Sequence, residues 1–199
     1  NYGGTAGNIA YALKLMGEAP RFSATIGSDH HKYFEWLETN NISREGIKII
    51  PQELTAGAYI TTDTGNNQIT GFNPGAMKYS SELEFNGVDP TETMVLISPG
   101  NLDDMITYPK KCRETDIRYI FDPGQALPML QPQDLIDVIG GCMVLIVNDY
   151  EYNLIQDKTG LSKTELLDLA QATIITLGEN GSEIYDNGSK VVVPSFEAD

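Results

Sequence analysis

The chain has 199 residues, enough for one α/β domain with a sizeable core, and its 28 acidic and 13 basic residues give a net charge of −15. This charge disfavours nucleic acid and anionic membrane surfaces as partners, although backbone amides or a helix N-terminus can still hold a phosphate-bearing ligand locally. No apolar run approaches the roughly 20 residues of a membrane-spanning helix, and Cys112 and Cys142 lack the spacing of a metal site or a disulfide framework. We therefore expect a cytoplasmic protein with two reduced thiols.

Helix and strand patterns alternate at the start of the chain. Apolar residues at helical spacing predict a helix over residues 8–16, and Gly17 is a typical stop. A short apolar run over 22–26 predicts a buried strand, and a second amphipathic helix is expected around 33–37. This order is typical of an α/β protein.

A β-hairpin is predicted to interrupt the alternation. The runs 59–62 and 68–72 flank the turn-rich segment 63–67, as in two antiparallel strands joined by a turn. Both strands mix polar and apolar side chains, so one face is expected to meet solvent or a ligand. We therefore expect an insert of about residues 52–77 that serves as a lid.

The alternation then resumes and predicts a mostly parallel sheet. Strands are expected at 94–98, 119–121, 143–147 and 173–177, with helices at 102–113, 133–139 and 149–158. Gly160 is expected to end the last of these helices. Ser162 and Glu165 form a capping-box pattern that predicts a helix through Ala172. Asn187-Gly188 predicts a type I′ turn in a final hairpin of strands 182–185 and 190–193.

The first motif that can carry chemistry is Gly3-Gly4 followed by Asn8. Glycine lets backbone amides approach a ligand closely, and an Asn amide can donate to and accept from hydroxyl groups. The pattern therefore suits a polyol such as a ribose. Taken alone, it is better explained by a tight turn whose helix is capped by Asn8.

The second motif, Asn148-x2-Glu151, follows an apolar strand at the edge of the sheet where α/β proteins usually bind ligands. Glu151 could hold Mg²⁺ through water, because magnesium needs only one or two carboxylates beside phosphate oxygens. The alternative is that Asn148 or Asp149 is a helix N-cap with Glu151 in the first turn. Asp122 also follows a strand and either organises a turn or orients a ligand.

The third motif, Thr176-x-Gly178-x2-Gly181, joins two predicted strands. Its glycines would leave amides free to meet a phosphate or a purine edge, and Thr176 offers a hydroxyl. In isolation, a plain hairpin loop with glycines for backbone geometry explains the motif better. The order and spacing of all three motifs favour phosphoryl transfer, which needs an acceptor site, a carboxylate near a metal and a nucleotide site.

Together the motifs resemble those of the ribokinase family, also called PfkB-type carbohydrate kinases. Residues 3–10 are similar to the first family signature, and residues 68–77, 121–125 and 147–151 resemble the adenosine-kinase-like branch. The resemblance spans essentially the whole chain. It implies a ribokinase-like three-layer α/β domain over 1–199, with a mostly parallel sheet and a small β-hairpin lid.

The resemblance also implies roles for individual residues. Acceptor binding falls to Gly3, Gly4, Asn8, Gln68 and Phe72, with Tyr59 a further candidate to pack on a base or sugar. ATP binding falls to Asn148, Thr176, Gly178 and Gly181, and Mg²⁺ to Glu151 with Asn148. The cofactors implied are therefore ATP and Mg²⁺.

Two family features do not appear in this sequence. Members begin with a strand that carries a substrate-binding Asp, and they end with a Gly-Ala/Cys-Gly-Asp segment whose Asp is the general base. Asp199 ends the segment 195–199 without that glycine pattern, so it is not assigned this role. We expect the chain to be a fragment of a longer enzyme, with no catalytic residue of its own and inactive by itself.

The function expected from these observations is ATP- and Mg²⁺-dependent phosphorylation of a hydroxyl of a sugar or nucleoside, with an adenosine-like acceptor favoured. A non-catalytic nucleotide- or sugar-binding module of the same fold is the alternative. A Rossmann dehydrogenase fits the alternation but lacks a Gly-x-Gly-x2-Gly motif after any predicted strand. The expected partners are a small sugar or nucleoside, with no nucleic acid and no membrane, and a second copy bound through the hairpin edge.

Overall fold

The computed structural model describes residues 2–196, which fall into two compact units that divide after Leu83. The first unit contains the diglycine motif and the predicted hairpin, and the second contains the two later motifs. Asp199 lies outside the described residues. None of the helices within 2–196 combines the length and the apolar character that crossing a bilayer requires.

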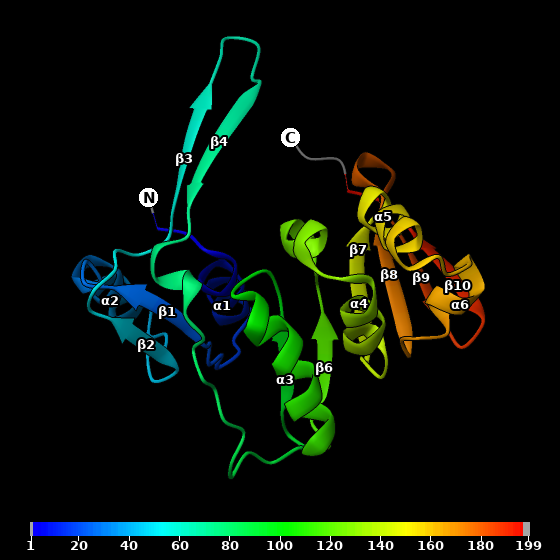
Figure 1. The fold of residues 1–199 in the computed structure, drawn as a ribbon, viewed down its shortest axis with the longest axis horizontal. Helices are drawn as coiled ribbons and strands as arrows, with labels where there is room; N and C mark the ends of the chain where they lie inside the picture. The colour runs from blue at the N-terminus through cyan, green and yellow to red at the C-terminus, as the bar shows by residue number, and fades with distance from the viewer. Residues whose placement is uncertain (1, 197–199) are drawn as a thin grey trace. The chain divides into compact units, whose positions relative to one another are not determined.

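The first unit is built on a small helix and strand core. Its regular elements before the hairpin are α1 (Thr5–Leu15), β1 (Ala24–Gly27), α2 (His31–Thr39) and β2 (Ile47–Ile50) (Figure 1). Strands β1 and β2 pair in parallel, with α2 as the crossover between them. Ala10 of α1 and Leu37 of α2 are buried with Phe22 and Ile42, and the rings of Tyr33 and Trp36 pack against this cluster. Apolar residues on one side of each helix therefore hold the two helices and the strands together.

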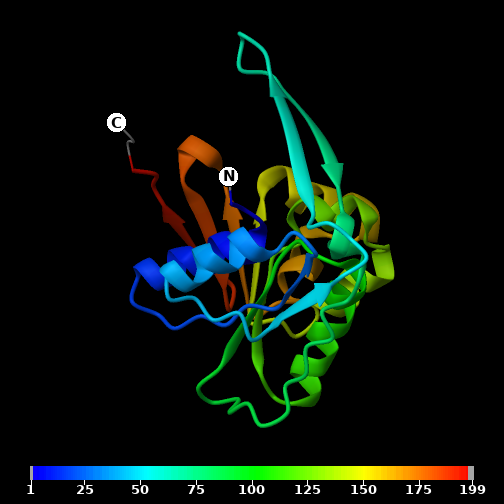
Figure 2. The same ribbon diagram turned by 90° about the vertical axis from the view of Figure 1, so that its left-hand side faces the viewer.

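The predicted hairpin is confirmed. Strands β3 (Gly57–Thr62) and β4 (Gln68–Asn73) pair antiparallel along their whole length, and every residue of β4 is exposed. The two strands project away from the rest of their unit (Figures 1 and 2). At the root, the amide and hydroxyl of Thr55 both donate to Asp29 Oδ1, at 2.9 and 2.6 Å, and the Ala76 amide donates to the Leu54 carbonyl. These bonds attach the hairpin firmly to the loop after β1 and to the short helix η1 (Gly75–Lys78).

The second unit is a six-stranded sheet in the order β10-β9-β8-β7-β6-β5. Four parallel strands, β5 (Met94–Ile97), β6 (Arg118–Phe121), β7 (Val144–Asn148) and β8 (Ala172–Thr176), precede the antiparallel pair β9 (Ser182–Asp186) and β10 (Ser189–Val193). Helices α3 (Leu102–Glu114), α4 (Pro132–Ile139), α5 (Asp149–Thr159) and α6 (Lys163–Leu167) and the short helices η2 (Gly124–Met129) and η3 (Gly178–Asn180) connect them. The expected mostly parallel sheet is confirmed.

The direction of the chain across this sheet explains where its helices lie. Each step from β5 to β8 moves one position the same way, so right-handed crossovers place the connecting helices on one face. Helix α3 packs against α4 and α4 against α5, as this argument requires. Side chains that point to these helices, such as Phe121 and Leu145, are fully buried.

Several turn and cap predictions are confirmed in this unit. Ser162 and Glu165 form the expected capping box, and Gly160 ends α5 in the left-handed conformation at φ 73°. Asn187 and Gly188 both have positive φ, at 46° and 75°, as a type I′ turn requires. Side-chain oxygens and glycines at these positions satisfy backbone geometry locally, so neighbouring sequence alone specifies them.

Two helix boundaries are wrong. The first helix begins at Thr5 instead of Asn8, and its N-cap is Gly4 without a side-chain hydrogen bond. The helix expected to continue to Ala172 ends at Leu167. The amides of Gln171 and Ala172 donate to the carbonyls of Cys142 and Met143, so bonds to a distant segment turn the chain into β8 and end the helix early.

Both cysteines are free thiols within the core of the second unit. Cys112 and Cys142 are completely buried, which raises their pKa values to about 11 and about 12. A thiol in such apolar surroundings stays protonated and unreactive at neutral pH. Neither cysteine is therefore a candidate nucleophile.

Candidate active site

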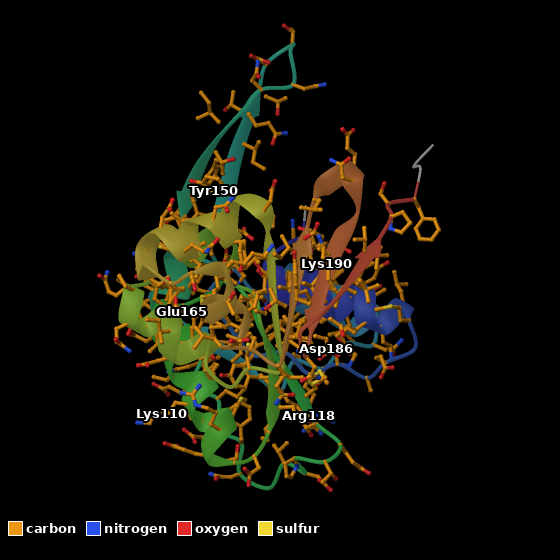
Figure 3. All side chains as sticks on the ribbon, turned by 90° about the vertical axis from the view of Figure 1, so that its right-hand side faces the viewer. Lys110, Arg118, Tyr150, Glu165, Asp186 and Lys190 are labelled. Atoms are coloured by element: carbon orange, nitrogen blue, oxygen red, sulfur yellow. The ribbon has the colours of Figure 1, made fainter. Side chains whose placement is uncertain are left out.

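Two predicted site residues end neighbouring strands at the same edge of the parallel sheet. Asn148 is the last residue of β7 and pairs in register with Thr176, the last residue of β8. The Thr176 hydroxyl also donates to the Val147 carbonyl oxygen, which lies 3.5 Å from Oγ1. Figure 3 shows Tyr150, two residues after Asn148, at this edge of the unit and Arg118, the first residue of β6, at the opposite edge. The sheet thus brings the second and third motifs together.

Asn148 and Glu151 form a complete capping box. The Glu151 amide donates to Asn148 Oδ1 at 2.7 Å, and the Asn148 amide donates to Glu151 Oε2 at 2.8 Å. The helix-cap interpretation of this motif is therefore confirmed. A ligand role remains compatible with it, because Oε1 of Glu151 makes no hydrogen bond within residues 2–196. The cap fixes the carboxylate while leaving one oxygen for another partner.

Asp122 directly follows β6, the strand that pairs with β7, and Glu151 lies in the helix after β7. The Asp122 amide donates to the Ile97 carbonyl at 2.8 Å, which fixes the backbone at the end of the sheet. Burial raises the pKa of the Asp122 carboxyl above its usual range, and the negative charge of Glu151 raises it further, whereas a hydrogen bond from the Gly124 amide lowers it. The negative charge of Glu151 therefore reaches Asp122, and a nearby cation would offset the charge of both carboxylates.

Two carboxylates can take part in a Mg²⁺ site, but they are too few to bind a metal ion without other ligands. Magnesium prefers oxygen ligands and keeps several waters, so Glu151 and Asp122 supply the right kind of donor. Within residues 2–196, no group of three or more His, Cys, Asp or Glu side chains could hold a metal ion. A magnesium ion here would therefore need water and phosphate oxygens to complete its shell.

The glycines of the third motif differ in what surrounds them. Gly178 has φ 58°, and a Cβ added there would meet nothing within 4 Å, so a ligand has room to approach its backbone. Gly181 has φ 83°, and an added Cβ would lie 2.0 Å from the Val193 carbonyl oxygen. The Leu177 amide donates to the Gly181 carbonyl at 2.8 Å and closes the loop. Gly181 is therefore required by the fold itself, whereas Gly178 leaves open space.

The diglycine motif lies at the start of α1. Gly3, Gly4 and Asn8 are all exposed, and Gly4 has φ 94°, a conformation that favours glycine. The Asn8 amide donates to the Gly4 carbonyl at 2.9 Å as the first hydrogen bond of the helix. The alternative that Asn8 caps the helix is wrong, because Asn8 lies inside α1 and its side chain makes no cap. Its exposed amide is free to meet a ligand.

Gln68 and Phe72 share one face of the hairpin. Residues at even spacing along a strand point the same way, so Gln68 near the turn and Phe72 near the root line the same side. Ile60 of β3 belongs to this face as well, since it pairs with Thr70. Phe72 is 53% exposed, which leaves its ring available for stacking.

The predicted acceptor and nucleotide residues lie in different units. Gly3, Gly4, Asn8, Gln68 and Phe72 belong to residues 2–83, and Asn148, Glu151, Thr176, Gly178 and Gly181 belong to residues 84–196. That both sets face one cleft stays a prediction. Sequence reasoning placed Asp122 correctly after a strand but had no signal for its proximity to Glu151, which comes from the pairing of β6 with β7.

Comparison with known proteins adds a family match. The model of the pfkB family carbohydrate kinases matches residues 1–199. A nucleoside kinase of Methanocaldococcus jannaschii is 30% identical over 199 residues, which cover 99% of this chain and 65% of the relative. A nucleoside kinase of Methanothermobacter thermautotrophicus is 28% identical, with 94% of this chain and 62% of the relative covered. The chain thus spans just under two thirds of the length of these curated relatives.

Solved structures with the same fold include a nucleoside kinase of Burkholderia thailandensis in complex with inosine. It superposes with a TM-score of 0.92 at 37% identity, covering 100% of this chain and 66% of that chain. The same enzyme in complex with ADP-inosine gives a TM-score of 0.87. The crystal structure of the Methanocaldococcus jannaschii nucleoside kinase, described as an archaeal member of the ribokinase family, gives 0.91 at 30% identity. The ribokinase-like fold expected from the motifs is therefore confirmed.

Proposed function

Since the chain belongs to the pfkB family of carbohydrate kinases, we propose that the protein is an ATP- and Mg²⁺-dependent kinase that phosphorylates a hydroxyl group of a nucleoside. The observation that carries this proposal is the juxtaposition of the Asn148–Glu151 cap with the Thr176 loop at the carboxyl edge of β7 and β8. Open α/β sheets bind ligands at this edge. A fixed carboxylate next to an open glycine loop supports a site for a nucleotide and its metal.

In this proposal each residue of the second unit has a defined task. Glu151, with Asp122, would hold Mg²⁺ directly or through water, and Asn148 fixes the Glu151 carboxylate through the cap. Thr176 and the open backbone of Gly178 contact ATP. When bound there, Mg²⁺ would supply positive charge that offsets the charge of the phosphates, which is the main electrostatic requirement of phosphoryl transfer. The general base is assigned to none of residues 2–196.

The acceptor is assigned to the first unit. Gly3, Gly4 and Asn8 present exposed backbone and amide groups that suit the hydroxyls of a ribose. The even-numbered face of the hairpin, with Phe72 and Gln68, would act as a lid that stacks on the base and excludes water from the transferring phosphoryl group. The nucleoside is favoured over a simple sugar because relatives at 30% and 37% identity are nucleoside kinases, one of them with bound inosine.

A panel of acceptors tests the function. ADP release by the full-length protein, followed with ATP and Mg²⁺, is expected to be faster with inosine or adenosine than with ribose or fructose, because only the nucleosides offer a base to the Phe72 face. Preference for a free sugar would contradict the acceptor assignment. Binding of ATP and nucleoside without ADP release would favour a non-catalytic binding module instead.

The hairpin also supports our proposal of a homodimer. Its odd-numbered face carries Tyr59 and Ile69, which are 71% and 79% exposed, and a lid would use only the opposite face. Between residues 54 and 77 the only charged residue is Asp63, so two chains of net charge −15 could meet there with little repulsion. We therefore expect two copies of this chain to meet through the odd-numbered face, and not through those of its surfaces that are rich in carboxylates.

Sedimentation of the full-length protein checks the dimer. We expect a dimer at micromolar concentration and a monomer for Ile69→Lys, because a charge would then lie in the apolar contact. Thr64→Lys, at the exposed turn between the strands, is the matched control and should leave the dimer intact. A wild-type monomer, or equal effects of the two variants, would contradict this interface.

A further inference from the structure

The side chain of Tyr33 links helix α2 to the diglycine turn. Its hydroxyl donates to the Gly3 carbonyl oxygen at 3.3 Å across thirty positions of sequence. The ring is held among aromatic neighbours, with its centroid 5.9 Å from that of Tyr2 and 5.6 Å from that of Trp36. Burial raises the pKa of the Tyr33 phenol, so the group remains a donor at neutral pH. Tyr33 is thus a fixed support with one polar end.

Gly7 completes the contact from the other side. A Cβ added to Gly7 would lie 2.1 Å from the Tyr33 hydroxyl oxygen and 3.4 Å from Cζ of the same ring. Gly7 is buried in the first half of α1, where any side chain would displace the hydroxyl. The third glycine of the motif therefore has a specific use, which is to make room for the oxygen that holds Gly3.

The turn itself has little other support. A Cβ added at Gly3 or at Gly4 would meet nothing within 4 Å in the described part of the chain, so a side chain at either position would find no packing partner there. Helix α1 has no side-chain cap, and the Gly4 carbonyl accepts from the Asn8 amide as an ordinary helical bond. The bond from Tyr33 therefore reaches the one residue of the motif that the helix does not hold.

We propose that Tyr33 is a positioning residue for the acceptor site, because its hydroxyl fixes the Gly3-Gly4 backbone against Gly7. This inference rests on the proposed function, in which Gly3, Gly4 and Asn8 bind acceptor hydroxyls. Tyr33 acts through the backbone and touches no substrate. A preorganised turn lowers the cost of ordering on binding, so its effect belongs in acceptor affinity instead of the chemical step.

Replacement of Tyr33 by Phe tests the role in binding. In the full-length protein, Tyr33→Phe is expected to raise the KM for the nucleoside about three- to tenfold, the value of one hydrogen bond, with the KM for ATP unchanged. Tyr11→Phe is the matched control: Tyr11 packs on Trp36 in the same aromatic group, and its hydroxyl makes no hydrogen bond within residues 2–196. If the wild-type protein is active and the two variants have equal KM values for the nucleoside, the role of Tyr33 is refuted while the proposed function stands.

A double-mutant cycle tests the contact independently of activity. Gly7→Ala alone should lower the urea midpoint of unfolding, because its Cβ collides with the hydroxyl. In Gly7→Ala/Tyr33→Phe the oxygen is gone and the nearest ring atom lies at an ordinary 3.4 Å, so most of the midpoint should return while the nucleoside KM stays high. Additive midpoint losses would refute the contact. A wild-type protein that binds no nucleoside would instead refute the proposed function, together with the role assigned to Tyr33.

Discussion

Replacing Glu151 by Gln is expected to abolish most Mg²⁺-dependent transfer while leaving the fold intact. A Gln side chain can still accept from the Asn148 amide, so the capping box survives and only the charge is lost. A metal bound mainly by water and phosphate depends strongly on that charge. We expect kcat to fall on the order of 100-fold. Losses of this size are typical when an outer-shell partner of a metal ion or a hydrogen bond to the transition state is removed. Steady-state kinetics over a Mg²⁺ titration measures the loss.

The second capping box of the same unit supplies a matched control. Glu165 accepts from the Ser162 amide at 2.8 Å with the same geometry, but it lies at the start of α6 and is exposed (Figure 3). Glu165→Gln should lower the free energy of unfolding slightly, because a negative charge near a helix N-terminus is lost, and Glu151→Gln should do the same. Only Glu151→Gln should affect catalysis. If both variants keep wild-type kcat, Glu151 is a helix cap and nothing more.

Replacing Gly181 by Ala is expected to be the most destabilising change in the nucleotide loop. The new Cβ would lie 2.0 Å from the Val193 carbonyl oxygen and 2.8 Å from backbone atoms of Pro194 and Ser195. These are backbone atoms, so the loop and the end of β10 must separate. The conformation of Gly181, at φ 83° and ψ −130°, is also nearly restricted to glycine. We expect a loss of about 3 kcal/mol or more in the free energy of unfolding.

Gly178→Ala separates the two effects that are combined at Gly181, which are the collision of the new Cβ with the backbone of β10 and the preference of positive φ for glycine. Gly178 also has positive φ, but an added Cβ meets nothing within 4 Å, so only the left-handed conformation is penalised. This costs about 1–2 kcal/mol. Urea unfolding of both variants and ATP binding by calorimetry check the pair. Equal stability losses would contradict the described packing of Gly181, and unchanged ATP affinity in Gly178→Ala would argue against a nucleotide at that position.

Local chemistry explains which elements the sequence could predict. The capping box of α6, the glycine that ends α5 and the Asn187-Gly188 turn each depend on groups a few residues apart, and all are confirmed. Strand β2 was not predicted. Its four residues, Ile47–Ile50, include Lys48, which pairs with Glu82 and donates to Ser80, and the strand exists because β1 offers a parallel edge. Such long-range pairing has no signature in a short segment.

The candidate site likewise has some features that the sequence could predict and others that it could not. Asn148 and Glu151 could be found from their spacing because the helix cap is local, and their place beside Thr176 followed from the rule that parallel strands end at one edge. The proximity of Asp122 to Glu151 depends on which strands are neighbours. Tyr33 gave no signal, because a Tyr at helical spacing indicates a buried face and its bond to Gly3 crosses between elements.

The attachment of the hairpin limits how it can move. Thr55 is tied to the Asp29 carboxylate by both its amide and its hydroxyl, and Ala76 is tied to Leu54 on the other side of the root. These hydrogen bonds oppose rotation of the hairpin as a rigid body about its root. Any displacement of its tip would therefore have to come from bending along β3 and β4, and substitutions that stiffen these strands would reduce it without any change at the root.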